Sequence, residues 1–493
     1  MKKQPLSSVL CLLVGISCLL LWFVSPFTTL PAAAQSLQNS SSTKLTKSLL
    51  EAVKEAKFKE VIDYGPYYEA CPGADFCPFP ARRIAHRPNV DVAVIQLDAN
   101  GGAQDVANVV LSRDYPDGLV VPIDRNYTAS SIRWRKWDIE RWDGGTFSDE
   151  NGQQLTTKGW TDNPSLTTAN DILAGRESAP YQFMVPYPAS LFKLLVAYRI
   201  MRLVDAGTLS LDQSYSYSDA SNEETVPITR LIRDWMDPMI AYSDNQATRA
   251  LLKLLHDLNQ VDAMNAEFRN LGLGTLQINN TDPTTGGSWQ PGEIHMTALD
   301  TARLLWLIEG ASDNRVLWTR PDGQPVTSAE LTSPSRAYLK GLLANQGYNE
   351  VLSTSNFGTY ISKGKLSGAP NTQPGIPATV PDRWIDPSDG TVTVEGIPYG
   401  QDVRFYNNNV AEVTFAHKTG LTFNYGSDAG IVESLAGKPY RHYIIAFIAN
   451  LGYRYADPIF ADRTSFPCYD EVGGICYTQR IPALAKQIDN QLK

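Results

Sequence analysis

The sequence predicts an α+β layered fold with a helical lobe. Apolar residues with helical spacing dominate from Ser190 to about Asp300. One strand-like apolar run comes early, at 92–97, and ends at an Asn-Gly-Gly turn. Helices in the middle of the chain and strands gathered mainly at its end are typical of an α+β architecture. The late strand signals lie at 413–417, 429–432 and 443–448.

The helix predictions follow from apolar spacing and from start and stop residues. Pro227 suits a first helical position, and Pro238 is expected to stop that helix. Gly310 is expected to end a helix that begins at Met296. The predicted helices are 49–62, 190 onward, 227–236, 247–258, 296–308 and a closing helix at 481–492.

Composition narrows the class of protein. The chain has 493 residues, of which 43% are hydrophobic, so it can form a large core of one to three domains. Its net charge of -9 argues against a nucleic-acid partner and against attachment to an anionic membrane surface.

The N-terminus has the pattern of an export signal. Lys2 and Lys3 precede a mostly apolar run at 9–24, and small residues end at Ala34. We therefore expect a signal peptide at 1–34, a flexible tether at 35–48, and a periplasmic or secreted protein with no stable membrane span. An uncleaved membrane anchor is the alternative, although the run is short for a bilayer.

Four cysteines remain after signal removal. An even count in an exported chain favours disulfides, and short loops favour Cys71–Cys77 and Cys468–Cys476. Sequence alone allows three connectivities. A metal site is the alternative, but none of the five histidines lies near these cysteines, so we expect no metal.

The first candidate for catalysis is Ser190, three residues before Lys193. Ser190 opens an amphipathic helix, where free backbone N–H groups point outward. A serine hydroxyl needs a base to become a nucleophile, and a partly buried lysine one turn away can be that base. Two other Ser-x-x-Lys copies, at 41–44 and 362–365, open no such helix.

Two further motifs support a site around Ser190. In Ser243-Asp244-Asn245 the serine can relay a proton to a leaving nitrogen, and the Asn245 amide can hold a substrate carbonyl. A second Ser-Asp-Asn copy, at 312–314, is expected to be a turn. In Lys418-Thr419-Gly420 the first two side chains can bind a substrate carboxylate, and Gly420 lets a substrate backbone lie against the strand.

These three motifs, in this order, resemble those of class A β-lactamases and penicillin-binding proteins. The resemblance covers about 180–312 and 410–450. It implies a serine β-lactamase/DD-peptidase-like fold, with an antiparallel sheet, flanking helices and a helical lobe. We expect a catalytic domain at 181–493 with an insertion at about 363–405. Residues 49–180 hold a helix, the first strand and an extension, irregular over 103–180, that resembles nothing known to us.

The resemblance also implies the chemistry. Ser190 attacks an amide carbonyl, backbone amides of Ser190 and Leu421 form the oxyanion hole, and Ser243 protonates the leaving nitrogen. Lys418 and Thr419 hold the substrate carboxylate. We expect a monomer that needs no cofactor.

One position departs from the family. Class A enzymes carry a glutamate that activates the deacylating water, and the corresponding stretch, 281–289, contains no glutamate. Asp282 is the only carboxylate there. It is either a general base with a shorter reach or the opener of an Asp-Pro turn.

The predicted function is hydrolysis of β-lactam antibiotics through an acyl-enzyme on Ser190. The alternatives are a peptidoglycan D-alanyl-D-alanine carboxypeptidase, a slow β-lactam-binding relative, or a non-enzymatic binding module. The segments at 203–212 and 239–245 resemble the sequences that flank the class A motifs and favour the first function, whereas the missing glutamate favours a carboxypeptidase or a slow enzyme.

Overall fold

The computed structural model describes most of the chain after residue 42. The predicted signal peptide, the four mature cysteines and both Ser-x-x-Lys copies at 41–44 and 362–365 lie wholly or partly outside the described residues. Of the predicted tether, residues 44–48 belong to helix α2 (Lys44–Glu55). The described residues are 43–63, 82–84, 87–137, 176–218, 226–349, 351–353, 356–357, 375–405, 407–422, 424–452, 455–458 and 477–493.

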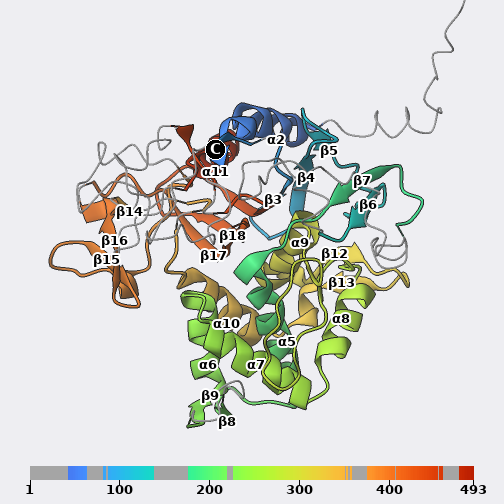
Figure 1. Cartoon of the computed structure of the whole chain (residues 1–493), viewed down its shortest axis with the longest axis vertical. Helices are drawn as coiled ribbons and strands as arrows, with labels where there is room; N and C mark the ends of the chain where they lie inside the picture. Colours follow the sequence, from blue (N-terminus) through green and yellow to red (C-terminus); the bar gives the residue numbers. More distant parts are fainter. Residues whose placement is uncertain are drawn as a thin grey trace, which may run out of the picture. The chain divides into compact units, whose positions relative to one another are not determined.

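The core of the fold is a six-stranded antiparallel sheet, which confirms the predicted α+β class. Its order is β17-β18-β19-β3-β4-β5 (Figure 1). Strands from the early and late parts of the chain pair directly, since β3 lies beside β19. Residues on both sides of the predicted boundary at 180 therefore contribute strands to the same sheet. The strands are β17 (Val413–Leu421), β18 (Gly426–Ser434), β19 (His442–Ala449), β3 (Val90–Leu97), β4 (Ala103–Leu111) and β5 (Leu119–Val120).

Strand β4 was not predicted, because residues 103–180 were expected to be irregular. It forms a hairpin with β3 across the turn at 98–102. Residues 103–106 of β4 are partly buried or exposed, whereas residues 107–111 are buried. That change in burial hides the alternating pattern that marks a strand.

Helices cover both faces of the sheet. Helix α9 (Ala298–Glu309) packs on one face, against β3, β18 and β19. Helices α2 and α11 (Arg480–Gln491) contact each other on the other face (Figure 1). Gly310, with φ of 76°, ends α9 as predicted. None of the helices in the described ranges has the length and apolar content needed to cross a bilayer.

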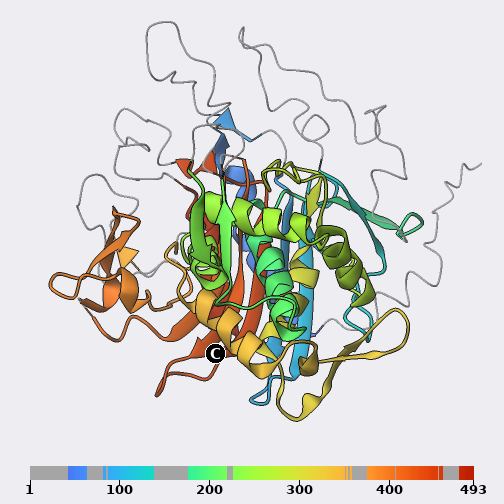
Figure 2. The ribbon, with the colours of Figure 1, turned by 90° about the horizontal axis from the view of Figure 1, so that it is seen from below.

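The predicted helical lobe is present and lies in front of the central strands in Figure 2. Helix α10 joins the lobe to the sheet, since it contacts both α5 and β17. Trp235 and Tyr198, in the lobe, are among the largest fully buried side chains of the described residues. The lobe consists of α5 (Lys193–Asp205), α6 (Ile232–Ala241), α7 (Asn245–Asp257), α8 (Val261–Asn270) and α10 (Ser333–Ala344).

The helix predicted at 227–236 is wrong at both ends. Pro227 precedes a short strand, β9 (Ile228–Leu231), and Pro238 lies inside α6. A proline in a helix removes one backbone hydrogen bond. Here the burial of Trp235, Met239 and neighbouring apolar residues outweighs that loss, and α6 continues to Ala241.

Smaller elements complete the described part. The insertion carries a hairpin, β15 (Thr391–Val394) and β16 (Ile397–Asp402). The remaining strands are β1 (Ile62–Asp63), β2 (Arg82–Arg83), β6 (Ile132–Arg135), β7 (Tyr181–Met184), β8 (Ser214–Tyr217), β10 (Gln277–Ile278), β11 (Ile294–His295), β12 (Val316–Thr319), β13 (Pro325–Thr327), β14 (Asn356–Phe357) and β20 (Tyr455–Ala456).

A buried carboxylate joins the sheet to helix α9. Asp91, on β3, is fully buried and accepts hydrogen bonds from the Ala298 backbone N–H at 2.8 Å and from the Asn108 amide at 2.7 Å. Burial raises the pKa of Asp91 from 3.8 to about 6, against the effect of these hydrogen bonds. The native state therefore holds a proton that the unfolded chain has already lost.

The unfolding free energy should fall as pH rises from about 4 to about 6, by about 3 kcal/mol for this group. Asp91→Asn cannot titrate, so its stability should vary less over this range in urea unfolding at several pH values. Asp117→Asn, at an exposed position, is the control. Equal pH slopes in both variants would contradict this assignment.

Candidate active site

Ser190 lies on a short 3-10 turn, η2 (Ala189–Phe192), that leads directly into α5. The prediction of a helix start is therefore correct, with one tight turn before the α-helix. Ala189 has a φ of 48°, which non-glycine residues rarely adopt. Ser190 is half-buried, and its hydroxyl has no hydrogen-bond partner within the described part of the chain. A strained turn with a free hydroxyl is typical of a presented nucleophile.

Lys193 is fully buried one turn after Ser190 and points to the second motif. Its amine donates to Ser243 Oγ at 3.1 Å and Asn245 Oδ1 at 2.8 Å, and also to the Ser243 carbonyl. Burial, followed by the charge of Lys418, holds the pKa of Lys193 well below its usual value, and Asp244 opposes both. A lysine with a lowered pKa is neutral, and able to accept a proton, at a lower pH than an ordinary lysine.

The Ser243 loop joins α6 to α7. Ser243 has a φ of 66°, again in the left-handed region. Asp244 caps α7, because its carboxylate accepts from the Ala247 N–H at 2.5 Å. Asn245 is exposed, and its oxygen is taken by Lys193, which leaves the amide nitrogen for a substrate carbonyl. The other Ser-Asp-Asn copy forms a separate 3-10 turn, η3 (Ser312–Asn314).

Lys418 reaches the same hydroxyl from the sheet. Its amine donates to Ser243 Oγ at 3.0 Å and to the Thr419 carbonyl at 2.7 Å. Burial lowers the pKa of Lys418 from 10.5 to about 7, although Asp428 opposes the shift. The Ser243 hydroxyl therefore lies between two buried lysine amines, both of which exchange protons more readily than an exposed lysine.

Gly420 allows strand β17 to approach the nucleophile turn. A Cβ atom at Gly420 would lie 2.4 Å from the Pro188 carbonyl oxygen and 2.7 Å from the Leu191 nitrogen. Ser427 strengthens this junction, since its hydroxyl donates to the Pro188 carbonyl at 2.5 Å. The sequence analysis missed Ser427, although its pairing with Gly420 in the β17–β18 register could have indicated it. Gly420 thus has a packing role in addition to its predicted role toward substrate.

The same junction orders the remaining motif residues. Leu421 follows Gly420 directly, and Ser190 precedes Leu191, so the two predicted oxyanion-hole residues flank one close backbone contact. Thr419 is 4% exposed on the strand between Lys418 and Gly420. All three predicted motifs therefore meet in one place.

Asp282 lies in the loop at 281–293 and its carboxylate faces its own turn. Asp282 Oδ1 accepts from the Thr284 N–H and from the Thr284 hydroxyl, each at 2.7 Å. These hydrogen bonds lower the pKa of Asp282. The loop residue close to Lys193 is Trp289, whose ring centroid lies 5.9 Å from the Lys193 amine and 5.2 Å from the Phe192 ring. Sequence reasoning missed Trp289, since an aromatic in a loop has no distinctive signal.

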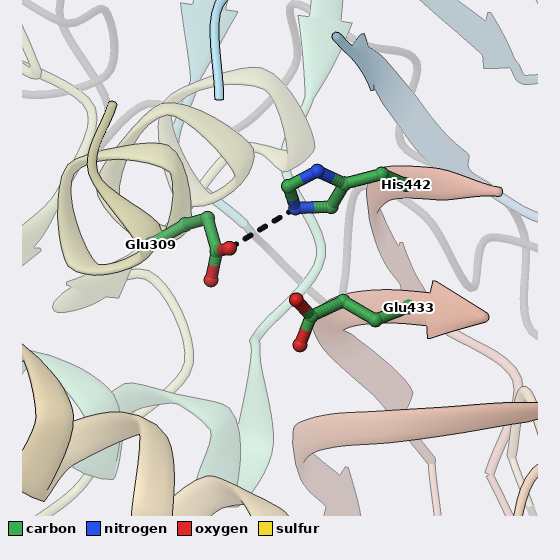
Figure 3. A group of neighbouring side chains, drawn as sticks. All are labelled: Glu309, Glu433 and His442. Atoms are coloured by element: carbon green, nitrogen blue, oxygen red, sulfur yellow. Dashed lines mark hydrogen bonds and ion pairs between the residues drawn. The ribbon is translucent and has the colours of Figure 1, made fainter. Parts of the chain in front are cut away.

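Among the described residues, three neighbouring side chains are of types that bind metal ions. Figure 3 shows Glu309, Glu433 and His442 facing one another, with His442 hydrogen-bonded to Glu309 at 3.0 Å. The Lys340 ammonium contacts both carboxylates at 2.7 Å. Lys340 therefore supplies positive charge to both carboxylates, and the four side chains form an ion-pair network.

A model of the "Beta-lactamase enzyme family" matches residues 175–355, which include Ser190, Lys193 and Ser243. Solved structures also match. PBP-A is 16% identical with a TM-score of 0.36, covering 63% of this chain and 85% of that one. A β-lactamase from Chitinophaga pinensis is 16% identical with a TM-score of 0.34, covering 62% and 84%. One from Streptosporangium roseum is 14% identical with a TM-score of 0.35, covering 62% and 85%.

No curated protein matches the chain. The family match and the meeting of the three motifs on an antiparallel sheet with a helical lobe agree with each other. Residues 175–355 therefore resemble the β-lactamase enzyme family, and the motifs at Ser190 and Ser243 lie within this matched segment.

The pKa of Lys418 predicts how substrate binding depends on pH. Below a pH of about 7 its amine is charged and can pair with a substrate carboxylate, and above that pH it is neutral. The dissociation constant of benzylpenicillin should rise about tenfold between about pH 6 and about pH 8, since about a tenth of the amines remain charged one pH unit above the pKa.

Calorimetry on Ser190→Ala would measure this binding without acylation. The methyl ester of benzylpenicillin has no carboxylate, so its dissociation constant should stay constant over the same range. The same pH dependence for both compounds would show that the Lys418 charge does not bind the carboxylate.

Proposed function

We propose that this protein is an exported serine hydrolase that opens the amide bond of β-lactams through an acyl-enzyme on Ser190. The observation that carries the proposal is the Ser243 hydroxyl, held between the Lys193 amine at 3.1 Å and the Lys418 amine at 3.0 Å, beside the Ser190 turn. Such an arrangement can remove a proton from a nucleophile and deliver one to a leaving nitrogen. Export rests on the N-terminal pattern alone.

The reaction divides into two halves. In acylation, neutral Lys193 takes the proton of Ser190 as Oγ bonds to the carbonyl carbon, and the backbone amides of Ser190 and Leu421 stabilise the oxyanion. The C–N bond then breaks, Ser243 gives its proton to the nitrogen, and a neighbouring lysine ammonium reprotonates Ser243. In deacylation, water replaces Ser190 on the carbonyl carbon, and Ser190 regains its proton.

A second candidate is a penicillin-binding protein that acts as a D-alanyl-D-alanine carboxypeptidase and releases β-lactam adducts slowly. The position of Trp289 favours it. The residue that the 281–293 loop places near Lys193 is aromatic, whereas the Asp282 carboxylate is held by Thr284. The described residues supply the groups proposed for acylation, whereas Asp282, the candidate base for the deacylating water, is hydrogen-bonded within its own turn.

Ser190→Ala tests the nucleophile. The variant should form no covalent adduct with a fluorescent penicillin, because the hydroxyl that accepts the acyl group is gone. Denaturing gel fluorescence measures the adduct, and thermal unfolding checks that the fold is intact. A labelled variant would exclude Ser190 as the acylated residue.

Asp282→Asn separates the two roles left open for Asp282. The amide oxygen of asparagine keeps the turn with Thr284 and cannot act as a base, so we expect the decay of the acyl adduct to change less than about threefold. General bases typically contribute about 10²–10⁴-fold. A loss of that size in single-turnover decay, followed by mass spectrometry, would establish Asp282 as the base and favour the β-lactamase function.

A further inference from the structure

The segment that follows helix α10 contacts both the end of α6, which precedes Ser243, and strands β17 and β18, which lie around Lys418. The strap, defined as residues 346–349 and 351–353, follows helix α10. Its first end binds the end of α6, where the Gln346 amide donates to the Ile240 carbonyl at 3.1 Å and the Gly347 N–H donates to the Ala241 carbonyl at 2.7 Å. These two carbonyls come shortly before Ser243 in the chain. The strap therefore fixes the point at which α6 ends and the Ser243 loop begins.

The second end of the strap binds the strands that carry Lys418. His417 hydrogen-bonds through Nδ1 to Asp428 at 2.8 Å and through Nε2 to Asn349 Oδ1 at 3.3 Å. The Leu352 N–H donates to the other oxygen of Asp428 at 3.1 Å. Asp428 is fully buried and His417 is 1% exposed, so these contacts are shielded from water.

The orientation of Asn349 is fixed by its neighbours. Its amide nitrogen donates to the Gly347 carbonyl at 3.1 Å, and its oxygen accepts from the Ser353 hydroxyl at 3.2 Å. Because a carbonyl can only accept, the Asn349 oxygen must face His417. The strap therefore offers one defined acceptor to the histidine that precedes Lys418.

The described residues of the strap are closely packed. A Cβ atom at Gly347 would lie 2.9 Å from the Val394 side chain of the β15–β16 hairpin and 3.3 Å from Trp384. Val351 and Leu352 are fully buried in the main core. Close packing of this kind transmits a change at one contact to its neighbours.

We propose that the strap is a positioning device that sets the spacing between Ser243 and Lys418, with Asn349 and His417 as its positioning residues. This inference rests on the proposed function, since it assigns a purpose to the 3.0 Å hydrogen bond between Lys418 and Ser243. The strap contacts the end of α6 and the strands β17 and β18. It acts on Ser243 through α6 and on Lys418 through the two strands.

The test measures acylation by benzylpenicillin, separated into the dissociation constant and the acylation rate constant. Asn349→Ala removes the acceptor for His417. His417→Asn keeps a donor for Asp428 but is too short to reach Asn349. Asn108→Ala, a fully buried asparagine on β4 that donates to Asp91, is the matched control for lost stability.

We expect Asn349→Ala and His417→Asn each to lower the acylation rate constant about tenfold, since small misplacement of catalytic groups has effects of this order or larger. The double variant should lose no more than either single variant, because both remove the same contact. Asn108→Ala should acylate at the wild-type rate. Additive losses, or an equal loss in Asn108→Ala, would overturn the proposal.

Crystal structures of wild type and Asn349→Ala give a readout independent of activity. The Ser243–Lys418 separation should lengthen in the variant beyond hydrogen-bond distance. An unchanged separation would overturn the strap as a positioning device. A wild-type protein that forms no penicilloyl adduct would instead overturn the proposed function, and the two crystal structures would still decide the role of the strap.

Discussion

Two buried lysines that share one serine hydroxyl are the constraint on which the rest of the site depends. Burial lowers the pKa values of both Lys193 and Lys418, and the charge of Lys418 lowers that of Lys193 further. The site therefore holds two amines that lose their protons more readily than exposed lysines do.

The fold supplies these groups from separate elements. Lys193 comes from α5 in the helical lobe, Ser243 from the loop between α6 and α7, and Lys418 from the β17 strand of the sheet. Ala189 and Ser243 are both held in left-handed conformations. Strain of this kind persists only when the surroundings fix the backbone. Close packing at Gly420 and capping of α7 by Asp244 are two such constraints.

Much of the site was predictable because it rests on short motifs that stay local. The sequence located the Ser190 turn, the Ser243 loop and the Lys418 strand, and apolar runs located β3, β17, β18 and β19. It did not locate β4, whose burial changes along its length, or the continuation of α6 through Pro238, where tertiary packing overrides local preference. The hydrogen-bond partners of Lys193 and Lys418 could not be predicted either, because contacts between segments far apart in the chain leave no pattern in the local sequence. The same holds for Trp289 and for the strap.

We propose that Ser190 is the residue that this arrangement activates. Tandem mass spectrometry of the wild-type protein, digested after reaction with benzylpenicillin, tests it most directly. We expect a penicilloyl group on the peptide that contains Ser190, with fragment ions that place it on that side chain. A penicilloyl group on Ser243 or on any other residue, or no adduct at all, would contradict it.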